Sequence, residues 1–298
     1  MTKCPACLDE FARGDFTALA THLVTRADES DPDHVRWLNQ NVTKERATAE
    51  AIRPKLEAIF ARTGPVSEWI VARFVARFYG ARPHPFVLAL QHPSRATLLG
   101  YVVEHQHFLV QWVRSCAYIM ARTDDRAVVL YELDNLSTEF GGEEEGRGPA
   151  HYELLLRMGE ALGVPRDRVL STPPLPSTRR GIEGWQRIAS QEPWVEALAA
   201  MHALELIAHR DLRRRGATVG YFDPAILKGT EIPAAAQAFL REGYEADVGH
   251  SEAALALVDR HTERLGRVEE VQATALRSFD LFDDYLMARL ERALEFER

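Results

Sequence analysis

A strongly apolar segment carries ionisable side chains at its centre. The stretch "GYVVEHQHFLVQWVRSC" at 100–116 sets Glu104, His105 and His107 among valine, leucine, phenylalanine and tryptophan residues. A buried carboxylate is costly unless it is paired, hydrogen-bonded or bound to a cation. Residues three or four apart share one face of a helix, so Glu104 and His107 can converge on one metal ion. The same stripe predicts Tyr101, Gln111 and Ser115 beside them, whereas His105 points elsewhere.

Two other stretches offer ligands of the same kind. "LREGYEADVGHSEAAL" places Asp247 and His250 at i and i+3 on a strongly helical segment, and Glu139 lies in "DNLSTEFGG", shortly before a glycine turn. Single pairs of this type are common on solvated helix surfaces. Their joint occurrence gives a mixed oxygen and nitrogen set, which suits iron or manganese with open coordination positions.

The first 42 residues have the residue types of a small zinc finger of the C2H2 type, with the expected ββα arrangement. Cys4 and Cys7 form a C-x-x-C, His22 lies on a predicted helix, and the next histidine is His34, after the acidic loop "DESDPD". Two thiolates and two imidazoles make a tetrahedral zinc site, and so small a module needs the metal to fold. A redox dithiol is the alternative reading, but no βαβ pattern surrounds the cysteines. We therefore expect structural Zn(II) at these four residues.

Composition restricts the class of protein. The chain has 298 residues, 46% hydrophobic and 27% charged, with a formal charge of −8 and three cysteines. A large core can form, and the negative charge argues against non-specific binding to nucleic acid or to acidic membranes. The N-terminus lacks the apolar core of a signal peptide, and polar residues interrupt the apolar run of 98–121. These features predict a cytoplasmic protein without a membrane segment.

The rest of the chain, 43–298, reads as one all-α domain of about seven or eight helices. Apolar residues recur with the helical period, and strand signals are essentially absent after the finger. Stretches 141–149 and 171–181 are rich in glycine or proline and are predicted loops. The predicted helical segments cover 44–63, 66–80, 94–125, 126–142, 149–163, 192–216, 232–261 and 267–298.

From residue 44 onward the chain resembles the haem-oxygenase-like superfamily, which includes thiaminase II, pyrroloquinoline-quinone synthase and non-haem di-iron oxidases and oxygenases. "SRATLLGYVVEHQHF", "RAVVLYELDNLSTEFGG" and "GYEADVGHSEAA" resemble its three ligand helices in order. The resemblance implies a haem-oxygenase-like bundle that holds one or two Fe(II) ions. The implied ligands are Glu104, His107, Glu139, Asp247 and His250. Gly243 stands where the third ligand helix of the family has its first histidine. One iron would then have an open coordination position, or the site would hold a single iron.

The resemblance also implies the reaction. Iron would activate dioxygen to oxidise a small molecule such as an amino acid, an amine or a fatty acid. Tyr101, Gln111 and His151 would lie in the pocket or orient its ligands. No residue identifies the substrate, because Arg95, Arg114 and Arg241 cannot be placed from the sequence.

Three alternatives stay open at this point. A quinone-synthase-like oxidation would use histidines and tyrosines without a metal. A thiaminase-like reaction would need a cysteine nucleophile, but Cys116 lies in an apolar stretch and is expected to be an inert buried thiol. A finger on a helical scaffold could serve interaction alone, as a lid, a dimerisation element or a partner contact. The acids after Arg26 disfavour nucleic acid as that partner, whereas a homodimer remains open.

Overall fold

The N-terminal module folds as the sequence predicts. The computed structural model describes residues 1–141, 149–229 and 232–297, without the side chains of 245–250. Strands β1 (Thr2–Lys3) and β2 (Glu10–Phe11) pair antiparallel, with Thr2 opposite Phe11, and α1 (Phe16–Asp28) follows them. Asp31 caps the next helix, α2 (Pro32–Asn41), by accepting from the backbone N–H of Asp33 and of His34. The predicted ββα zinc-finger arrangement is confirmed, with α2 as an addition that carries His34, the predicted fourth ligand.

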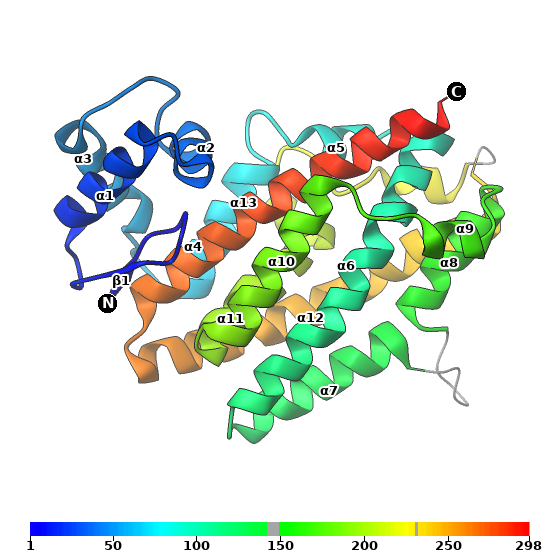
Figure 1. The fold of residues 1–298 in the computed structure, drawn as a ribbon. Coiled ribbons are helices and arrows are strands. Elements are labelled where there is room, and N and C mark those ends of the chain that lie inside the picture. Colours follow the sequence, from blue (N-terminus) through cyan, green and yellow to red (C-terminus); the bar gives the residue numbers. More distant parts are fainter. Residues whose placement is uncertain (142–148, 230–231, 298) are drawn as a thin grey trace.

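The remainder is an all-α bundle, as predicted (Figure 1). Its long helices come from segments whose apolar residues follow the helical period. Among the described residues its α-helices are α3 (Ala49–Phe60), α4 (Val66–Phe78), α5 (Pro85–Ala89), α6 (Arg95–Arg122), α7 (Arg126–Phe140), α8 (His151–Ala161), α9 (Arg166–Ser171), α10 (Pro176–Gln191), α11 (Trp194–His202), α12 (Ala234–Leu265) and α13 (Val268–Ala293).

Several local features differ from the sequence prediction, and α5, α9 and α10 lie outside the predicted helical segments. The predicted loop at 171–181 is shorter, because α10 begins at Pro176, a residue type suited to the first helical turn. The predicted helix over 192–216 ends as an α-helix at His202 and continues as 3₁₀ turns, η1 (Ala203–Ala208) and η2 (Arg210–Arg215). A third 3₁₀ turn, η3 (Pro224–Leu227), precedes α12, and η4 (Leu294–Phe296) follows α13. Residues 142–148 of the other predicted loop lie outside the described part.

Helices α6 and α13 approach each other closely, and this contact positions the interior polar groups. A Cβ atom added at Gly100 of α6 would lie 2.2 Å from the backbone oxygen of Arg289 and 2.7 Å from the backbone nitrogen of Ala293, both on α13. Only glycine therefore allows the two backbones to pack at this distance. As a result, Arg289 and Arg292 of α13 reach side chains in the middle of α6.

The finger packs against the body rather than extending away from it. Lys3 is almost fully buried and contacts the carboxylates of Glu192 and Glu196, the second at 2.8 Å. Asp33 of α2 pairs with Arg277 of α13 at 2.9 Å. Figure 1 shows β1, α1 and α2 beside one end of α13. These contacts bury one face of the finger against the body.

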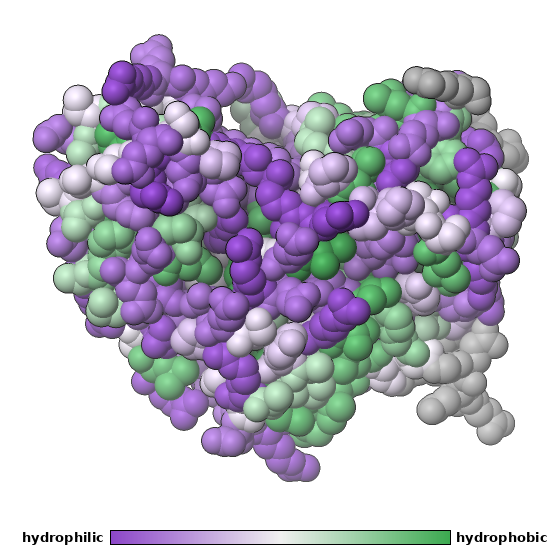
Figure 2. All heavy atoms as spheres, in the orientation of Figure 1, coloured by the Kyte–Doolittle hydropathy of each residue, from purple (hydrophilic) through white to green (hydrophobic). Residues whose placement is uncertain are grey.

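Large apolar side chains are exposed along α7. Leu130 and Leu133 of α7 are 51% and 50% exposed, and Phe140 at the end of this helix is 38% exposed. Figure 2 shows apolar atoms gathered in the lower part of the view, over α6 and α7. No described helix is both long and apolar enough to cross a membrane. The homodimer left open by the sequence analysis stays a prediction.

Candidate functional site

The four predicted zinc ligands lie together. The ligand atoms of Cys4, Cys7, His22 and His34 are all within 4.8 Å of one another. Cys7 Sγ lies 3.3 Å from His22 Nε2, and Cys4 Sγ lies 3.7 Å from His34 Nε2. The Nδ1 of His34 donates to Asp31 Oδ1 at 2.7 Å, which leaves Nε2 for a metal. Two sulfurs and two imidazoles at this spacing fit a tetrahedral zinc ion.

We expect Cys4→Ser to lose about one zinc ion per chain, because serine does not supply the thiolate that zinc binds. The same substitution should lower the unfolding temperature, since the buried face of the finger packs on α13. Metal analysis by plasma mass spectrometry and a thermal melt measure both effects. Cys116→Ser is the matched control, because this thiol is buried far along the chain from the finger. Equal zinc content in the Cys4 variant and the parent would contradict the assignment.

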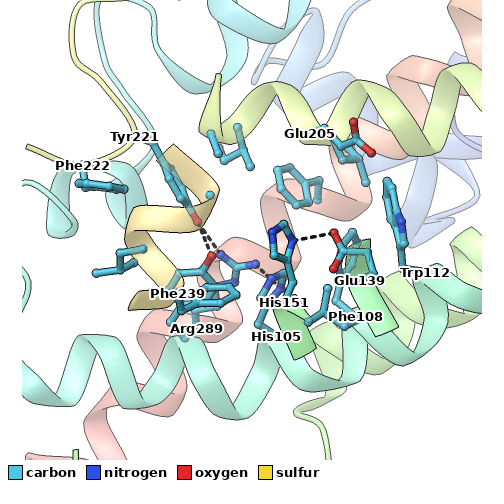
Figure 3. A pocket seen from close by; sticks show the side chains of 18 residues that line it. His105, Phe108, Trp112, Glu139, His151, Glu205, Tyr221, Phe222, Phe239 and Arg289 are labelled. Atoms are coloured by element: carbon cyan, nitrogen blue, oxygen red, sulfur yellow. Dashed lines mark hydrogen bonds and ion pairs between the residues drawn. The ribbon is translucent and has the colours of Figure 1, made fainter. Parts of the chain in front are cut away.

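A cavity in the helical body has α6 as one wall. Its volume is about 90 Å³. The side chains that α6 contributes include Tyr101, His105, Phe108 and Trp112. Other walls come from α7, α8, η1, α12 and α13 (Figure 3). The size suits a small organic molecule rather than a peptide or a polymer.

The register of α6 differs from the predicted stripe. Tyr101 lines the cavity as expected, but the next lining residue is His105, four positions on, rather than Glu104, three positions on. A residue three or four positions further along lies on the same face of a helix. Because α6 is buried on nearly all sides, the apolar period could not show whether Glu104 or His105 faces the cavity. The pocket role predicted for Gln111 is not supported by its placement, because its Nε2 donates to Ser115 Oγ outside the cavity lining.

Glu104 and His107 contact other groups. The fully buried carboxylate of Glu104 accepts from Arg292 Nε at 2.7 Å and from the backbone N–H of Leu175 at 3.2 Å. His107 Nε2 donates to the backbone oxygen of Thr172 at 3.0 Å. Neither residue lines the cavity. The cation that compensates the charge of Glu104 in this structure is thus the guanidinium of Arg292. Glu104 and His107 do not form one ligand group with Glu139.

Glu139 and His151 do face the cavity together. His151 Nδ1 donates to Glu139 Oε1 at 2.9 Å, from the start of α8 to the end of α7. A carboxylate in this position fixes the tautomer and the orientation of an imidazole, as in histidine–carboxylate general bases. Gly243 of α12 also lines the cavity. The predicted ligands Asp247 and His250 lie outside the described residues, and their iron-binding role stays a prediction.

Arg289 lies at the centre of a polar network that the sequence analysis missed. Its Nη2 donates to Tyr285 Oη at 2.7 Å and to His105 Nδ1 at 3.0 Å, and its Nη1 donates to Tyr221 Oη at 3.2 Å. Tyr221 in turn donates to Tyr101 at 3.0 Å. Because His105 Nδ1 accepts, its proton is on Nε2. Burial, then the charge of Arg289, lowers the pKa of His105 well below its usual value, so this imidazole is neutral.

A second buried network lies behind Trp112. His202 contacts Glu132 through Nε2 and Glu205 through Nδ1, both at 2.9 Å. The 3₁₀ turn after His202 places Glu205 on the same side of the chain as His202, because residues i and i+3 eclipse in such a turn. Cys116 is also within reach, its ligand atom lying within 4.8 Å of those of Glu132 and His202. Both imidazole nitrogens are engaged with carboxylates, so the group is satisfied as an imidazolium between two anions.

This network predicts a stability that decreases in alkali. Burial alone would lower the pKa of His202, but Glu132 and Glu205 outweigh it and raise the pKa to about 10. In the unfolded chain the pKa is about 6.5, so the folded state holds the extra proton between these values. We expect the free energy of unfolding to fall as pH rises from about 6.5 to about 10. Urea titrations across this range measure the slope. A Glu132→Gln/His202→Gln double variant should give a shallower slope, and an equal slope would contradict the prediction.

Family models match both parts of the chain. The model for the TENA/THI-4/PQQC family matches residues 69–293, and a model for a C2H2 type zinc-finger matches residues 1–61. The first match covers the helices that line the cavity. The second match includes the four predicted zinc ligands and extends through α3.

Curated relatives agree with the match to the TENA/THI-4/PQQC family. A pyrroloquinoline-quinone synthase of Pseudomonas aeruginosa is 30% identical over 128 residues, 42% of this chain and 50% of the relative. One of Acinetobacter baylyi is 28% identical over 42% of this chain and 49% of the relative. The chain thus spans about half the length of these curated relatives.

Two solved structures share the fold at low identity. A domain with a heme oxygenase-like fold from Shewanella denitrificans aligns with a TM-score of 0.57, at 18% identity, over 78% of this chain and 91% of that chain. A TenA homolog from Pseudomonas syringae aligns with a TM-score of 0.54, at 14% identity, over 78% and 98%. With three quarters of its length matched by one family model, the chain belongs to the TENA/THI-4/PQQC family and carries a C2H2 type zinc-finger module before the family domain.

Proposed function

We propose that this chain is an oxidase that uses dioxygen to oxidise a small organic molecule bound in the cavity between α6, α7, α8, α12 and α13. The observation that carries the proposal is a pair of histidines that face one cavity from two of its walls, His105 from α6 and His151 from α8. His151 is oriented by Glu139, and His105 is neutral with its proton on Nε2. One histidine is suited to accept a proton and the other to donate a hydrogen bond.

The reaction is balanced without another co-reactant. The substrate loses two protons and two electrons. His151 takes the first proton and passes it on, and dioxygen accepts both electrons and both protons to become hydrogen peroxide. Such a substrate must form a stabilised carbanion or enolate, because it passes its electrons directly to dioxygen. His105 Nε2–H and the nearby guanidinium of Arg289 would stabilise the negative charge that develops. The quinone synthases among the relatives support this class, because a quinone is an oxidised ring system.

An iron-dependent version of the same oxidation is the second candidate. Glu139 and His151 offer a carboxylate and an imidazole in the cavity wall, and Glu139 Oε2 is buried without a hydrogen-bond partner in the described residues. Asp247 and His250 follow Gly243 in the sequence of α12. If bound, iron would supply a centre that reduces dioxygen. Glu104 does not fit this set, because Arg292 holds its carboxylate. This candidate expects iron to be lost in Glu139→Ala and kept in Glu104→Ala.

The proposal is tested by a search for oxygen-dependent turnover. Zinc-loaded, full-length protein is mixed with a metabolite extract in air and under argon, and mass spectrometry follows which compounds disappear. We expect at least one small molecule to be consumed only in air, with peroxide formed in equal amount. Heat-denatured protein serves as the control. If no compound is consumed in an oxygen-dependent way, the oxidase function is contradicted.

A further inference from the structure

The guanidinium of Arg289 is a buried cation with no anionic partner among the described side chains. Its side chain is 1% exposed, and no ion pair links it to any carboxylate among the described residues. Its nearest polar contacts are the phenols of Tyr285 and Tyr221 and the neutral imidazole of His105. Its Nε is buried without a hydrogen-bond partner. Burying an uncompensated charge is costly, so a missing counter-ion is expected.

Among the described side chains, the carboxylates at or beside the cavity are already paired with other cations or histidines. Glu104 pairs with Arg292, Glu139 with His151, and Glu205 with His202. Arg289 itself lines the cavity. Figure 3 shows Arg289 and Tyr221 toward one end of the cavity and Glu139, Glu205 and Trp112 toward the other, with the two histidines between them. The free positive charge therefore faces the space that a ligand would fill.

The rest of the wall defines the body of that ligand. Phe108, Trp112, Phe239 and Phe282 give the cavity an aromatic lining. The rings of Phe86, Tyr101 and Tyr285 lie 4.2 to 4.9 Å from the guanidinium carbon of Arg289 and hold the cation in place. Glu139 and Glu205 at the other end would repel a second anion. A single acidic group on an apolar or aromatic body satisfies all three conditions.

We propose that Arg289 is the subsite for the carboxylate of the substrate, and that the substrate is a small aromatic or apolar monocarboxylic acid. The placement of the reacting atom near His151 rests on the proposed function. The binding of the carboxylate at Arg289 does not. The carboxylate pairs with Arg289, the body lies against the aromatic wall, and the atom to be deprotonated lies near His151. Tyr221 and Tyr285 position the guanidinium through their hydroxyl groups.

The test compares a charged probe with a neutral one of nearly the same shape. Phenylacetate and phenylacetamide are titrated into zinc-loaded, full-length protein at neutral pH, and calorimetry measures each dissociation constant. We expect phenylacetate to bind about 10- to 100-fold more tightly, the range for a hydrogen bond to a charged group. Arg289→Met should abolish this preference and Arg289→Lys should keep part of it. Arg114→Met, at an exposed position on α6, should leave it unchanged.

Two further measurements keep the test independent of folding and of turnover. Circular dichroism and zinc content show whether each variant is folded. Tyr221→Phe should weaken the preference for phenylacetate without abolishing it, because it removes one hydroxyl group that positions the guanidinium and leaves the charge in place. A tyrosinate absorption band at neutral pH that disappears in Tyr221→Phe would identify an internal counter-ion and overturn the proposal. Equal binding of the two probes by the parent protein would also overturn it, even if oxygen-dependent turnover is found. Selective binding without turnover would support the subsite and contradict the oxidase function alone.

Discussion

Glu104→Ala is expected to lower the free energy of unfolding by about 3 to 5 kcal/mol, the usual cost of removing one partner of a buried ion pair. The carboxylate of Glu104 is fully buried, and the side chain of its partner Arg292 is 6% exposed. The backbone N–H of Leu175 would lose its acceptor as well. Because Glu295 still pairs with Arg292 at 2.8 Å, the effect should lie toward the lower end of this range. Urea unfolding of the iron-free protein measures it.

The matched control removes both charges. A Glu104→Ala/Arg292→Met double variant should recover part of the loss, because no unpaired charge is left inside the protein. His107→Ala, one helical turn further along α6, should cost less, since it removes one hydrogen bond to a backbone oxygen. If Glu104→Ala left the stability of iron-free protein unchanged but removed bound iron, the ligand role predicted from the sequence would hold instead.

His151→Ala is expected to lower kcat of the oxygen-dependent reaction by about 10²- to 10⁴-fold, the usual contribution of a positioned general base. The fold should be retained, because alanine fills the first turn of α8 without strain. Glu139→Gln should lower kcat less, since it weakens the orientation of the imidazole but leaves the base in place. Steady-state rates with the compound found by mass spectrometry measure both effects.

His107→Ala is the control for this prediction. Both residues are histidines that hydrogen-bond to nearby oxygens, but only His151 lines the cavity. We therefore expect the His107 variant to keep near-normal kcat. If both variants lost activity equally, or if His151→Ala lost none, the assignment of His151 as the base would be wrong.

The parts of the site that could be predicted are those fixed by local sequence. Cys4, Cys7 and His22 have finger spacing, and His34 was the next histidine along the chain. The all-α class followed from the helical period of the apolar residues. His151 was included as a pocket residue because a histidine after the glycine loop fits the family resemblance. Each of these inferences needed only neighbouring residues or their order.

The remainder depended on which side of a buried helix faces which neighbour. From Tyr101, both Glu104 and His105 continue a helical face, and only the close packing of α6 on α13 at Gly100 decides between them. Arg289 is separated from His105 by most of the body sequence, so their contact at 3.0 Å could not be inferred. A signal for it did exist, because Arg289 lies four residues after Tyr285 on the apolar stripe of α13. Burying an unpaired cation is costly, just as burying an unpaired carboxylate is, so a cation on a buried face indicates a polar or charged partner.

The measurement that tests the central claim most directly is oxygen uptake by protein that holds its zinc but has been stripped of iron. The substrate is the compound identified by mass spectrometry, and an oxygen electrode follows the rate before and after Fe(II) is added. The account predicts that iron-free protein takes up oxygen at its full rate, forms peroxide, and gains nothing from Fe(II). Uptake that stops without iron and returns only with Fe(II) would contradict oxidation by side chains alone, and would make Glu139 and His151 candidates for iron ligands.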